Sequence, residues 1–259
     1  SAAEAERHAV ENSEKRAQLL VAGGSSERAR HYYVDRPMRE PILRDFRDSA
    51  GQKVGIVTRN IYGALILNTA RLCFIDVDLP ERPPTSSVVN LIKRFFGGST
   101  PPVAEFVPET EALQRAEAWA NSHAPWLWRA YRTKAGLRFL AAHAPLEVDS
   151  RVVREAFEAL GADPLYQKLC AGQKCFRARL TPKPWRCGYS SAHLNWPFVD
   201  AAAESRFEKW DAAYRERCLA WRTCAALPSI GSARPAAQFA ELISYHDETS
   251  GVAGQLPLA

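Results

Sequence analysis

The chain has 259 residues, of which 46% are apolar and 24% charged, and its formal net charge is +5. This composition is typical of a globular protein. No apolar run is long enough to span a membrane, so the sequence predicts no membrane partner. The first residues, "SAAEAERHAVENSEKRAQ", are charged and rich in Ala and contain no apolar secretory core, which predicts a cytoplasmic location.

The first fifty residues are predicted to form an arm. Residues 3–21 have a mostly polar helical pattern, and residues 32–50 are charged and irregular, with Pro37 and Pro41. We therefore expect an N-terminal helix and irregular arm over residues 1–50, followed by a single domain over the rest of the chain, residues 51–259.

The domain is predicted to begin with strands. Residues 53–59 are a strand candidate, and the apolar segments 61–68 and 71–78 are separated by a short turn, which is typical of a hairpin. The segment "LPERPP" ends this unit, because closely spaced prolines cannot continue a sheet. A helix with a serine N-cap is expected over residues 86–96.

The middle of the chain predicts two helices and a second hairpin. The helices are expected over 108–124 and about 150–161, and the hairpin strands over 126–133 and 137–143. Asp149 or Ser150 serves as the N-cap of the second helix, and Gly161 terminates it.

The last third of the chain predicts a strand, a long helix and a final strand. Residues 175–181 alternate, so that Arg177 and Arg179 share one face. Apolar residues recur at helical spacing over 200–226, and residues 237–248 are expected to be a strand. Hairpins interleaved with helices predict an α+β fold with a mostly antiparallel sheet.

Two aspartates, Asp76 and Asp78, end the apolar segment "LCFIDVD" and give the clearest chemical signal. On a strand, residues two apart point to the same face, and two neighbouring carboxylates repel unless a cation lies between them. We expect this pair at the end of a central strand, holding Mg²⁺ or Mn²⁺. Asp247, at the end of the expected last strand, is the candidate third catalytic acid, whereas Asp163 stands where a helix cap is expected. The alternative is two solvated carboxylates.

Three segments resemble the palm of the archaeo-eukaryotic primase-polymerase superfamily. The first is "LCFIDVD", which matches a strand ending in DxD. The second is "TKAGLRFLAAH", a small-residue turn followed by a strand and a histidine, with Gly136, Arg138 and His143. The third is "LISYHD", an apolar segment ending in Asp247. The resemblance implies a palm-like, RRM-like sheet, nucleotidyl transfer, and nucleotide binding by Arg138 or His143.

Basic residues mixed with aromatic residues predict a phosphate or nucleic-acid surface. Lys134 belongs to the basic stretch 129–138, and Arg177 and Arg179 belong to "KCFRARLTPKPWR". Trp185 either stacks on a base or covers the edge of the core. The alternative for the two arginines is an edge strand protected from aggregation by charge.

Cys170, Cys175, Cys187 and His193 form a C-x4-C-x11-C-x5-H pattern. Its spacing is looser than that of most zinc sites, so zinc is not expected, and we predict that at least two of these thiols are buried as small apolar groups.

Taken together, these signals predict metal-dependent nucleotidyl or phosphoryl transfer, similar to that of primase-polymerases, with a nucleotide or nucleic acid as partner. The alternatives are a non-catalytic nucleotide- or nucleic-acid-binding protein and a zinc-stabilised interaction module.

Overall fold

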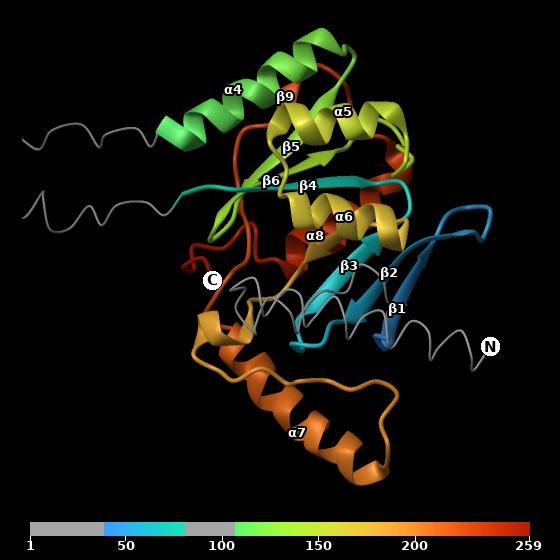
Figure 1. Ribbon diagram of the computed structural model, residues 1–259, viewed down its shortest axis with the longest axis vertical. Helices are drawn as coiled ribbons and strands as arrows, with labels where there is room; N and C mark the ends of the chain where they lie inside the picture. Colours follow the sequence, from blue (N-terminus) through green and yellow to red (C-terminus); the bar gives the residue numbers. More distant parts are fainter. Residues whose placement is uncertain (1–38, 81–106) are drawn as a thin grey trace, which may run out of the picture. The chain divides into compact units, whose positions relative to one another are not determined.

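Two β-sheets collect strands from distant parts of the chain (Figure 1). The computed structural model describes residues 39–80 and 107–259. The first sheet has the order β1-β2-β3-β7, and its neighbouring strands are antiparallel; they are β1 (Ile42–Arg47), β2 (Lys53–Arg59), β3 (Leu65–Thr69) and β7 (Phe176–Arg179).

The second sheet contains the aspartate strand and the second predicted hairpin. Its order is β4-β6-β5-β8, with β9 also paired to β5, and its pairings are antiparallel. The strands are β4 (Cys73–Asp78), β5 (Leu127–Arg132), β6 (Gly136–Ala141), β8 (Ala225–Ala226) and β9 (Ile230–Gly231). The predicted hairpin over 126–133 and 137–143 is confirmed by the pairing of β5 with β6.

The first predicted hairpin is wrong, because its two strands belong to different sheets. β3 pairs with β2 and β7, whereas β4 pairs with β6. The turn between β3 and β4 therefore takes the chain from one sheet to the other. β4 is also an edge strand of its sheet rather than the expected central strand.

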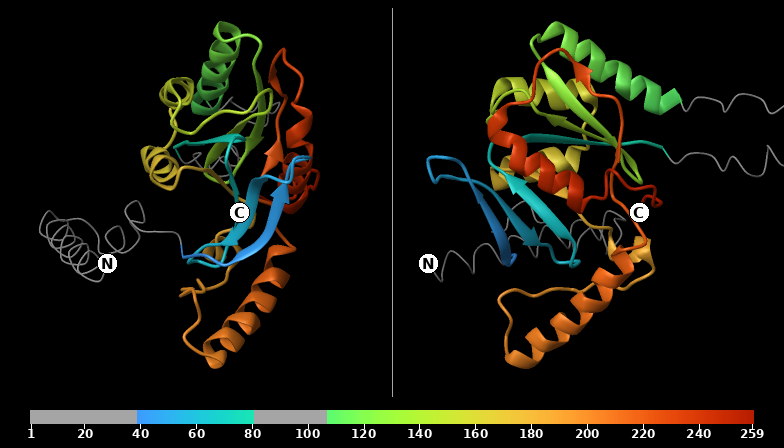
Figure 2. Two further views of the ribbon diagram at one scale, coloured as in Figure 1. Left: turned by 90° about the vertical axis from the view of Figure 1, so that its right-hand side faces the viewer. Right: turned by 180° about the vertical axis from the view of Figure 1, so that it is seen from behind.

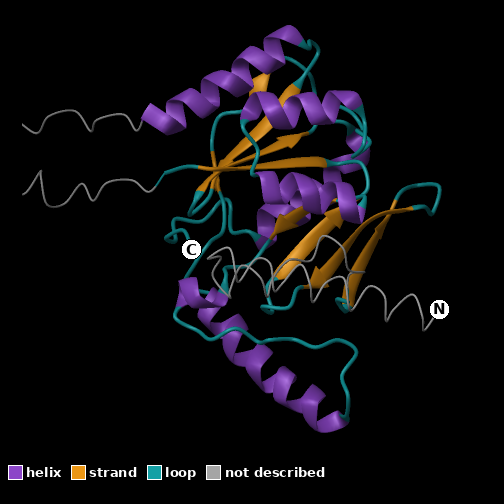
Figure 3. Ribbon diagram, viewed as in Figure 1, coloured by secondary structure: helices purple, strands orange, loops and turns teal. Residues whose placement is uncertain are grey.

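The helices are α4 (Val107–Ser122), α5 (Arg151–Leu160), α6 (Pro164–Gln173), α7 (Ala201–Cys218) and α8 (Ala240–Thr249), with short 3-10 turns η1 (Pro184–Cys187) and η2 (Ala237–Phe239) (Figure 3). Together with the sheets they make an α+β fold, as the sequence predicted. The side chain of Ser150, not Asp149, caps α5 by accepting from the Val153 N–H. Gly161 ends the helix with φ +72°.

Two predictions for the C-terminal third need correction. α7 ends at Cys218 instead of residue 226, and only Tyr214 of its expected apolar stripe is buried. Residues 237–248, expected to be a strand, form η2 and most of α8. The alternation of apolar residues there is too short to distinguish a strand from a helix that is buried on one side.

The prediction for the N-terminal arm also needs correction in the part of the arm that the structure describes. Residues 42–47, expected to be irregular, form β1, whose partner is β2. The predicted helices over 3–21 and 86–96 lie outside the described residues. Among the described residues, no helix is long and apolar enough to cross a membrane.

Helix α8 contacts both sheets and fixes their junction. α5 and α6 lie on one side of the second sheet and α8 on the other (Figure 2). On α8, the ring of Tyr245 lies 5.1 Å from Phe46 of the first sheet, and the ring of His246 lies 5.0 Å from Tyr131 of the second. The polar groups described next lie where α8 meets the strands.

Candidate functional site

Asp76 and Asp78 lie at the C-terminal end of β4, on the same face of the strand. Asp76 is opposite Arg138 and Asp78 is opposite Gly136 in the register with β6. The backbones approach closely at this point, since a Cβ added at Gly136 would lie 2.0 Å from the Val77 carbonyl oxygen. The glycine of the turn therefore determines where the second aspartate lies.

Arg138 holds Asp76 through a two-bond fork. Its Nε donates to Asp76 Oδ1 at 2.7 Å and its Nη2 donates to Oδ2 at 2.9 Å. Only 2% of the arginine side chain is exposed, compared with 32% of the aspartate side chain. Burial opposes the charged form of Arg138, but Asp76 outweighs it and raises the pKa of the guanidinium.

The buried position of Arg138 corrects the prediction that this residue grips a phosphate. Its third guanidinium nitrogen, Nη1, donates to the Arg179 carbonyl oxygen at 3.0 Å and lies 3.3 Å from His246 Nε2. All three nitrogens are thus engaged inside the protein, and Arg138 instead links β4, β7 and α8.

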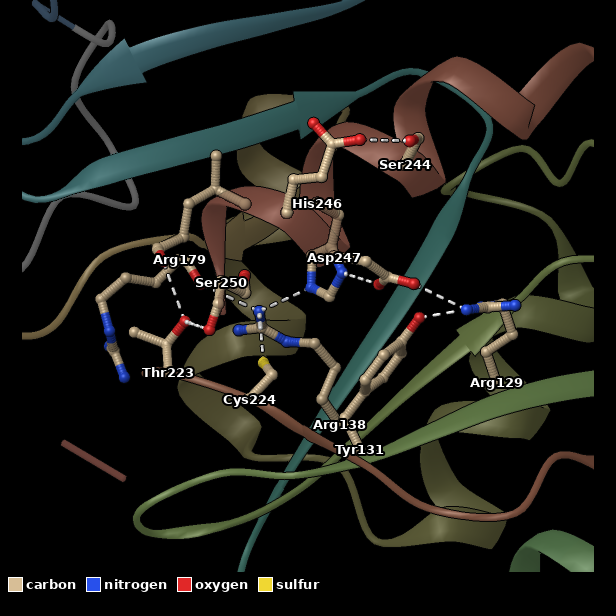
Figure 4. Close-up of polar contacts among 12 residues, drawn as sticks. Arg129, Tyr131, Arg138, Arg179, Thr223, Cys224, Ser244, His246, Asp247 and Ser250 are labelled. Atoms are coloured by element: carbon tan, nitrogen blue, oxygen red, sulfur yellow. Dashed lines mark hydrogen bonds and ion pairs between the residues drawn. The ribbon is translucent and has the colours of Figure 1, made fainter. Parts of the chain in front are cut away.

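A chain of polar contacts continues from Arg138 through α8 to β5, on the same face of the sheet (Figure 4). His246 Nδ1 lies 2.8 Å from Asp247 Oδ1, and Arg129 Nη2 donates to Asp247 Oδ2 at 2.6 Å. Arg129 Nε also donates to the Tyr131 hydroxyl at 2.9 Å. A guanidinium can only donate, so the contact with Arg138 requires His246 Nε2 to accept and Nδ1 to carry the proton given to Asp247.

Asp247 therefore has surroundings that differ from those expected of a third metal ligand. It lies on a helix, not at a strand end, and its two oxygens contact His246 and Arg129. Burial favours the neutral acid, but these partners outweigh burial and lower the pKa of the Asp247 carboxyl. Its charge stabilises the His246 tautomer that Arg138 requires.

Asp163 joins the two aspartates of β4. It caps α6 by accepting from the Leu165 N–H, and its own N–H donates to the Asp76 carbonyl oxygen at 3.1 Å. Asp78 is exposed at the strand end, yet the pKa of its carboxyl is raised. The largest cause is desolvation by the surrounding protein, followed by the negative charges of Asp163 and Asp76. Lys183 and Arg186 act in the opposite direction. The three carboxylates therefore lie within electrostatic reach of one another.

Three cations from β7 and the following turn lie within electrostatic reach of these acids: Arg179, Lys183 and Arg186, here called the cation trio. Burial and the two neighbouring arginines lower the pKa of Lys183 to about 8. Burial and Arg138 lower the pKa of Arg179 to about 10. Within residues 39–80 and 107–259, the buried Nε of Arg179 and Nη1 of Arg186 have no hydrogen-bond acceptor.

The remaining predicted binding residues lie in other surroundings. Lys134 is exposed in the β5–β6 turn. His143 is half-buried with its ring 4.2 Å from that of Trp126, and burial lowers its pKa. Arg177 forms an ion pair with Glu40 at 2.8 Å, whereas Arg179 approaches Asp76 and Arg138. The two arginines of the alternating strand therefore have different neighbours. β7 is an edge strand, so charge protection also remains a role for them.

The cysteines of the loose pattern do not gather at one place: Cys170 and Cys175 are neighbours, whereas Cys187 lies beside Cys218. Cys170 and Cys187 are buried, which confirms the prediction that at least two thiols are buried. Cys187 Sγ donates to the Pro184 carbonyl oxygen at 3.2 Å. In the part of the chain that the structure describes, no three His, Cys, Asp or Glu side chains are arranged to hold a metal ion. The absence of zinc stays a prediction.

A magnesium site would therefore rest on Asp76 and Asp78 alone or with water and substrate oxygens. Mg²⁺ commonly uses one or two carboxylates and takes its other ligands from water and phosphates. The oxygen donors and their shared face suit such an ion.

Lys183, Arg186 and His246 stand out in the sequence, but the sequence does not indicate which residues they contact. The cations flank the prolines of "TPKPWR", and the histidine precedes Asp247. Only the fold brings the first two to β4 and the third to Arg138.

Comparisons of the chain with protein-family models, with curated proteins and with solved structures found no significant match. The chain is defined by its α+β fold and by a polyionic site where β4, β7 and α8 meet. Its function has to be argued from that site.

Proposed function

We propose that the chain is a metal-dependent nucleotidyl or phosphoryl transferase, similar in its chemistry and its palm-like sheet to primase-polymerases. The observation that carries this proposal is that three aspartates, Asp76, Asp78 and Asp163, lie within electrostatic reach of the cation trio. A phosphate-transfer site needs both signs of charge, since carboxylates hold the metal ion and cations meet the phosphate oxygens.

The cation trio supports an anionic ligand. Like charges held together destabilise one another, and the lowered pKa of Lys183 reflects that repulsion together with burial. A bound phosphate would accept from the buried Arg179 and Arg186 nitrogens that have no acceptor among the described residues. The trio thus has the charge and the hydrogen-bond donors that a phosphate requires.

The roles of the acids follow from their partners. Asp76 and Asp78 would hold Mg²⁺ or Mn²⁺, with Asp163 as the nearest further acid, and Arg138 would orient Asp76. The ion would bring substrate phosphates to the site and neutralise part of their charge. Asp247 would act at a distance, by holding His246 against Arg138.

A Mn²⁺ titration, followed by the electron paramagnetic resonance signal of the free ion, tests the metal site. We expect Asp78→Asn to weaken Mn²⁺ binding at least tenfold, because one of two charged ligands is lost. Asp149→Asn, which changes an exposed acid beside α5, is the matched control and should bind as the unmodified protein does. Equal binding by both variants would contradict the metal site.

Release of pyrophosphate from nucleoside triphosphates, with Mn²⁺ and a single-stranded template, tests the transfer itself. The unmodified chain should release pyrophosphate, and Asp78→Asn should not. Mn²⁺ binding without any transfer would favour a second candidate function.

The second candidate is a non-catalytic nucleotide- or nucleic-acid-binding protein. It is favoured by the fork from Arg138, which engages both oxygens of Asp76. In that case anions would bind the cation trio equally well with and without a chelator, and Asp78→Asn would strengthen binding by removing a negative charge.

A further inference from the structure

Trp185 is a large aromatic side chain that the fold leaves open beside the cation trio. Half of its surface is exposed, so it does not cover the edge of the core, which was one of the two roles considered for it. It lies in the turn η1, between Lys183 and Arg186 of the trio. The indole and two of the three cations therefore belong to one four-residue segment, residues 183–186.

The indole is held in place by neighbours that leave it accessible. The ring of Tyr62 meets it edge-on, with 5.2 Å between centroids and an interplanar angle of 83°. The Lys183 ammonium lies 5.5 Å from the indole centroid. The ammonium therefore lies over one face of the indole, and the exposed half of the side chain is the part that a ligand can reach.

The turn that carries Trp185 is anchored on both sides. Pro184 is buried, and the Arg186 and Tyr189 N–H groups donate to the Lys183 and Pro184 carbonyl oxygens at 2.8 and 2.9 Å. Just before the turn, Thr181 Oγ1 accepts from the Leu65 N–H at 2.9 Å. A ring fixed in this way loses little conformational freedom when a ligand stacks on it.

We infer that Trp185 is a stacking platform for the base of a nucleotide whose phosphates bind the cation trio. This inference rests on the proposed function and adds to it a substrate class, because phosphate donors without an aromatic base have nothing to place against the indole. Base–aromatic stacking is tolerant of base identity, since every base has a π face. Purine and pyrimidine nucleotides should therefore both bind, with purines tighter.

Calorimetric titrations with ATP and with inorganic tripolyphosphate separate the base from the phosphates. Run in the presence of a chelator, they do not depend on the metal site. We expect ATP to bind the unmodified chain roughly 10- to 100-fold more tightly than tripolyphosphate. Trp185→Ala should reduce ATP affinity to that of tripolyphosphate, and Trp185→Phe should retain part of the difference.

Two further variants serve as controls. Trp196→Ala removes a half-buried indole that packs on Phe198 and should leave the ratio of the two affinities unchanged. Arg186→Gln should weaken ATP and tripolyphosphate by the same factor, because in this proposal its side chain contacts only phosphates. A 5′-phosphorylated oligothymidylate identifies the source of the base. A larger loss for the oligonucleotide than for ATP in Trp185→Ala assigns the platform to a strand, and the reverse assigns it to a free nucleotide.

The inference is overturned if ATP and tripolyphosphate bind equally and Trp185→Ala changes neither ATP nor oligonucleotide affinity. It is also overturned if neither phosphate ligand binds. In both cases the Mn²⁺ titration decides separately on the proposed function, so the two failures can be told apart.

Discussion

At the scale of single residues, Arg138 has the largest number of polar partners in the site. It is buried in the sheet, and its charge is met by one carboxylate, one carbonyl oxygen and one imidazole. A buried charge is tolerated when its partners are complete, and removal of one member leaves the others uncompensated. The same contacts that orient Asp76 therefore also contribute to stability.

We predict that Arg138→Met destabilises the protein by about 3 kcal/mol, near the lower end for buried pairs because Asp76 is partly exposed. Arg138→Lys should lose less stability, since lysine keeps the charge although it cannot form both hydrogen bonds to Asp76. Urea denaturation followed by circular dichroism measures both. A loss below about 1 kcal/mol for Arg138→Met would mean that the fork contributes little.

Lys183 makes anion binding dependent on pH. Its pKa is lowered to about 8 by burial and by the neighbouring arginines, so the side chain is charged below that pH and neutral above it. We predict that tripolyphosphate affinity falls as the pH rises from 7 to 9. Lys183→Gln should bind more weakly at pH 7 and show a flat profile over this range. A profile unchanged by the substitution would assign the titration to another group.

At the scale of elements, the site depends on the close approach of β4 and β6. Gly136 faces Asp78 across the ladder, and the Leu79 N–H donates to the Ala135 carbonyl oxygen at 2.9 Å just beyond it. No side chain fits between these backbones, because the Val77 carbonyl oxygen occupies the place of a Cβ. The position of the second aspartate is thus set by a glycine on the neighbouring strand.

Gly136→Ala should therefore weaken Mn²⁺ binding strongly, by displacing the end of β4, and should also lower stability. The control is Gly51→Ala, in a turn where an added Cβ meets nothing within 4 Å but φ is +76°. It should cost about 1–2 kcal/mol of backbone strain and leave Mn²⁺ affinity unchanged. Unchanged Mn²⁺ affinity in Gly136→Ala would mean that the hairpin geometry does not determine the metal site.

At the scale of the whole described part, residues 39–80 and 107–259, α8 joins the two sheets. Leu242 packs against the first sheet, where a Cβ added at Gly55 would lie 2.8 Å from its Cδ2. One turn further along the helix, His246 contacts Phe74 and Tyr131 of the second sheet. Residues four apart share a helix face, so a single face of α8 reaches both sheets.

We predict that Leu242→Ala lowers the free energy of unfolding by about 2–5 kcal/mol, the usual cost of a cavity at a buried leucine. The loss should appear in one cooperative transition, because α8 couples the sheets. Fluorescence and circular dichroism should give coincident curves. Two separate transitions in the variant would mean that the sheets unfold independently.

The elements with local signals were predictable from the sequence. The helix after Ser150, the hairpin around Gly136 and the alternating strand "FRAR" follow from capping, turn chemistry and periodicity, which act over a few residues. The aspartate pair was predictable for the same reason, since its i, i+2 spacing on a strand is a local property.

The errors arose where long-range packing decides the outcome. β3 and β4 look like a hairpin because their sequences are equally apolar. Instead, β3 pairs with the preceding strand β2 and with the distant β7, and β4 pairs with the distant β6. The segment before Asp247 is apolar enough for a strand, yet it is a helix because α8 must cover both sheets.

The sequence by itself determined which charges and rings are available: the aspartates of β4, the cations of "TPKPWR" and the tryptophan among them. Only the tertiary structure decided their partners, since Arg138 is equally able to hold a phosphate or a buried carboxylate. The physical reason is that a side chain's charge and shape are fixed by its own chemistry. Its burial, its pKa and its partner depend on atoms that distant segments bring to it.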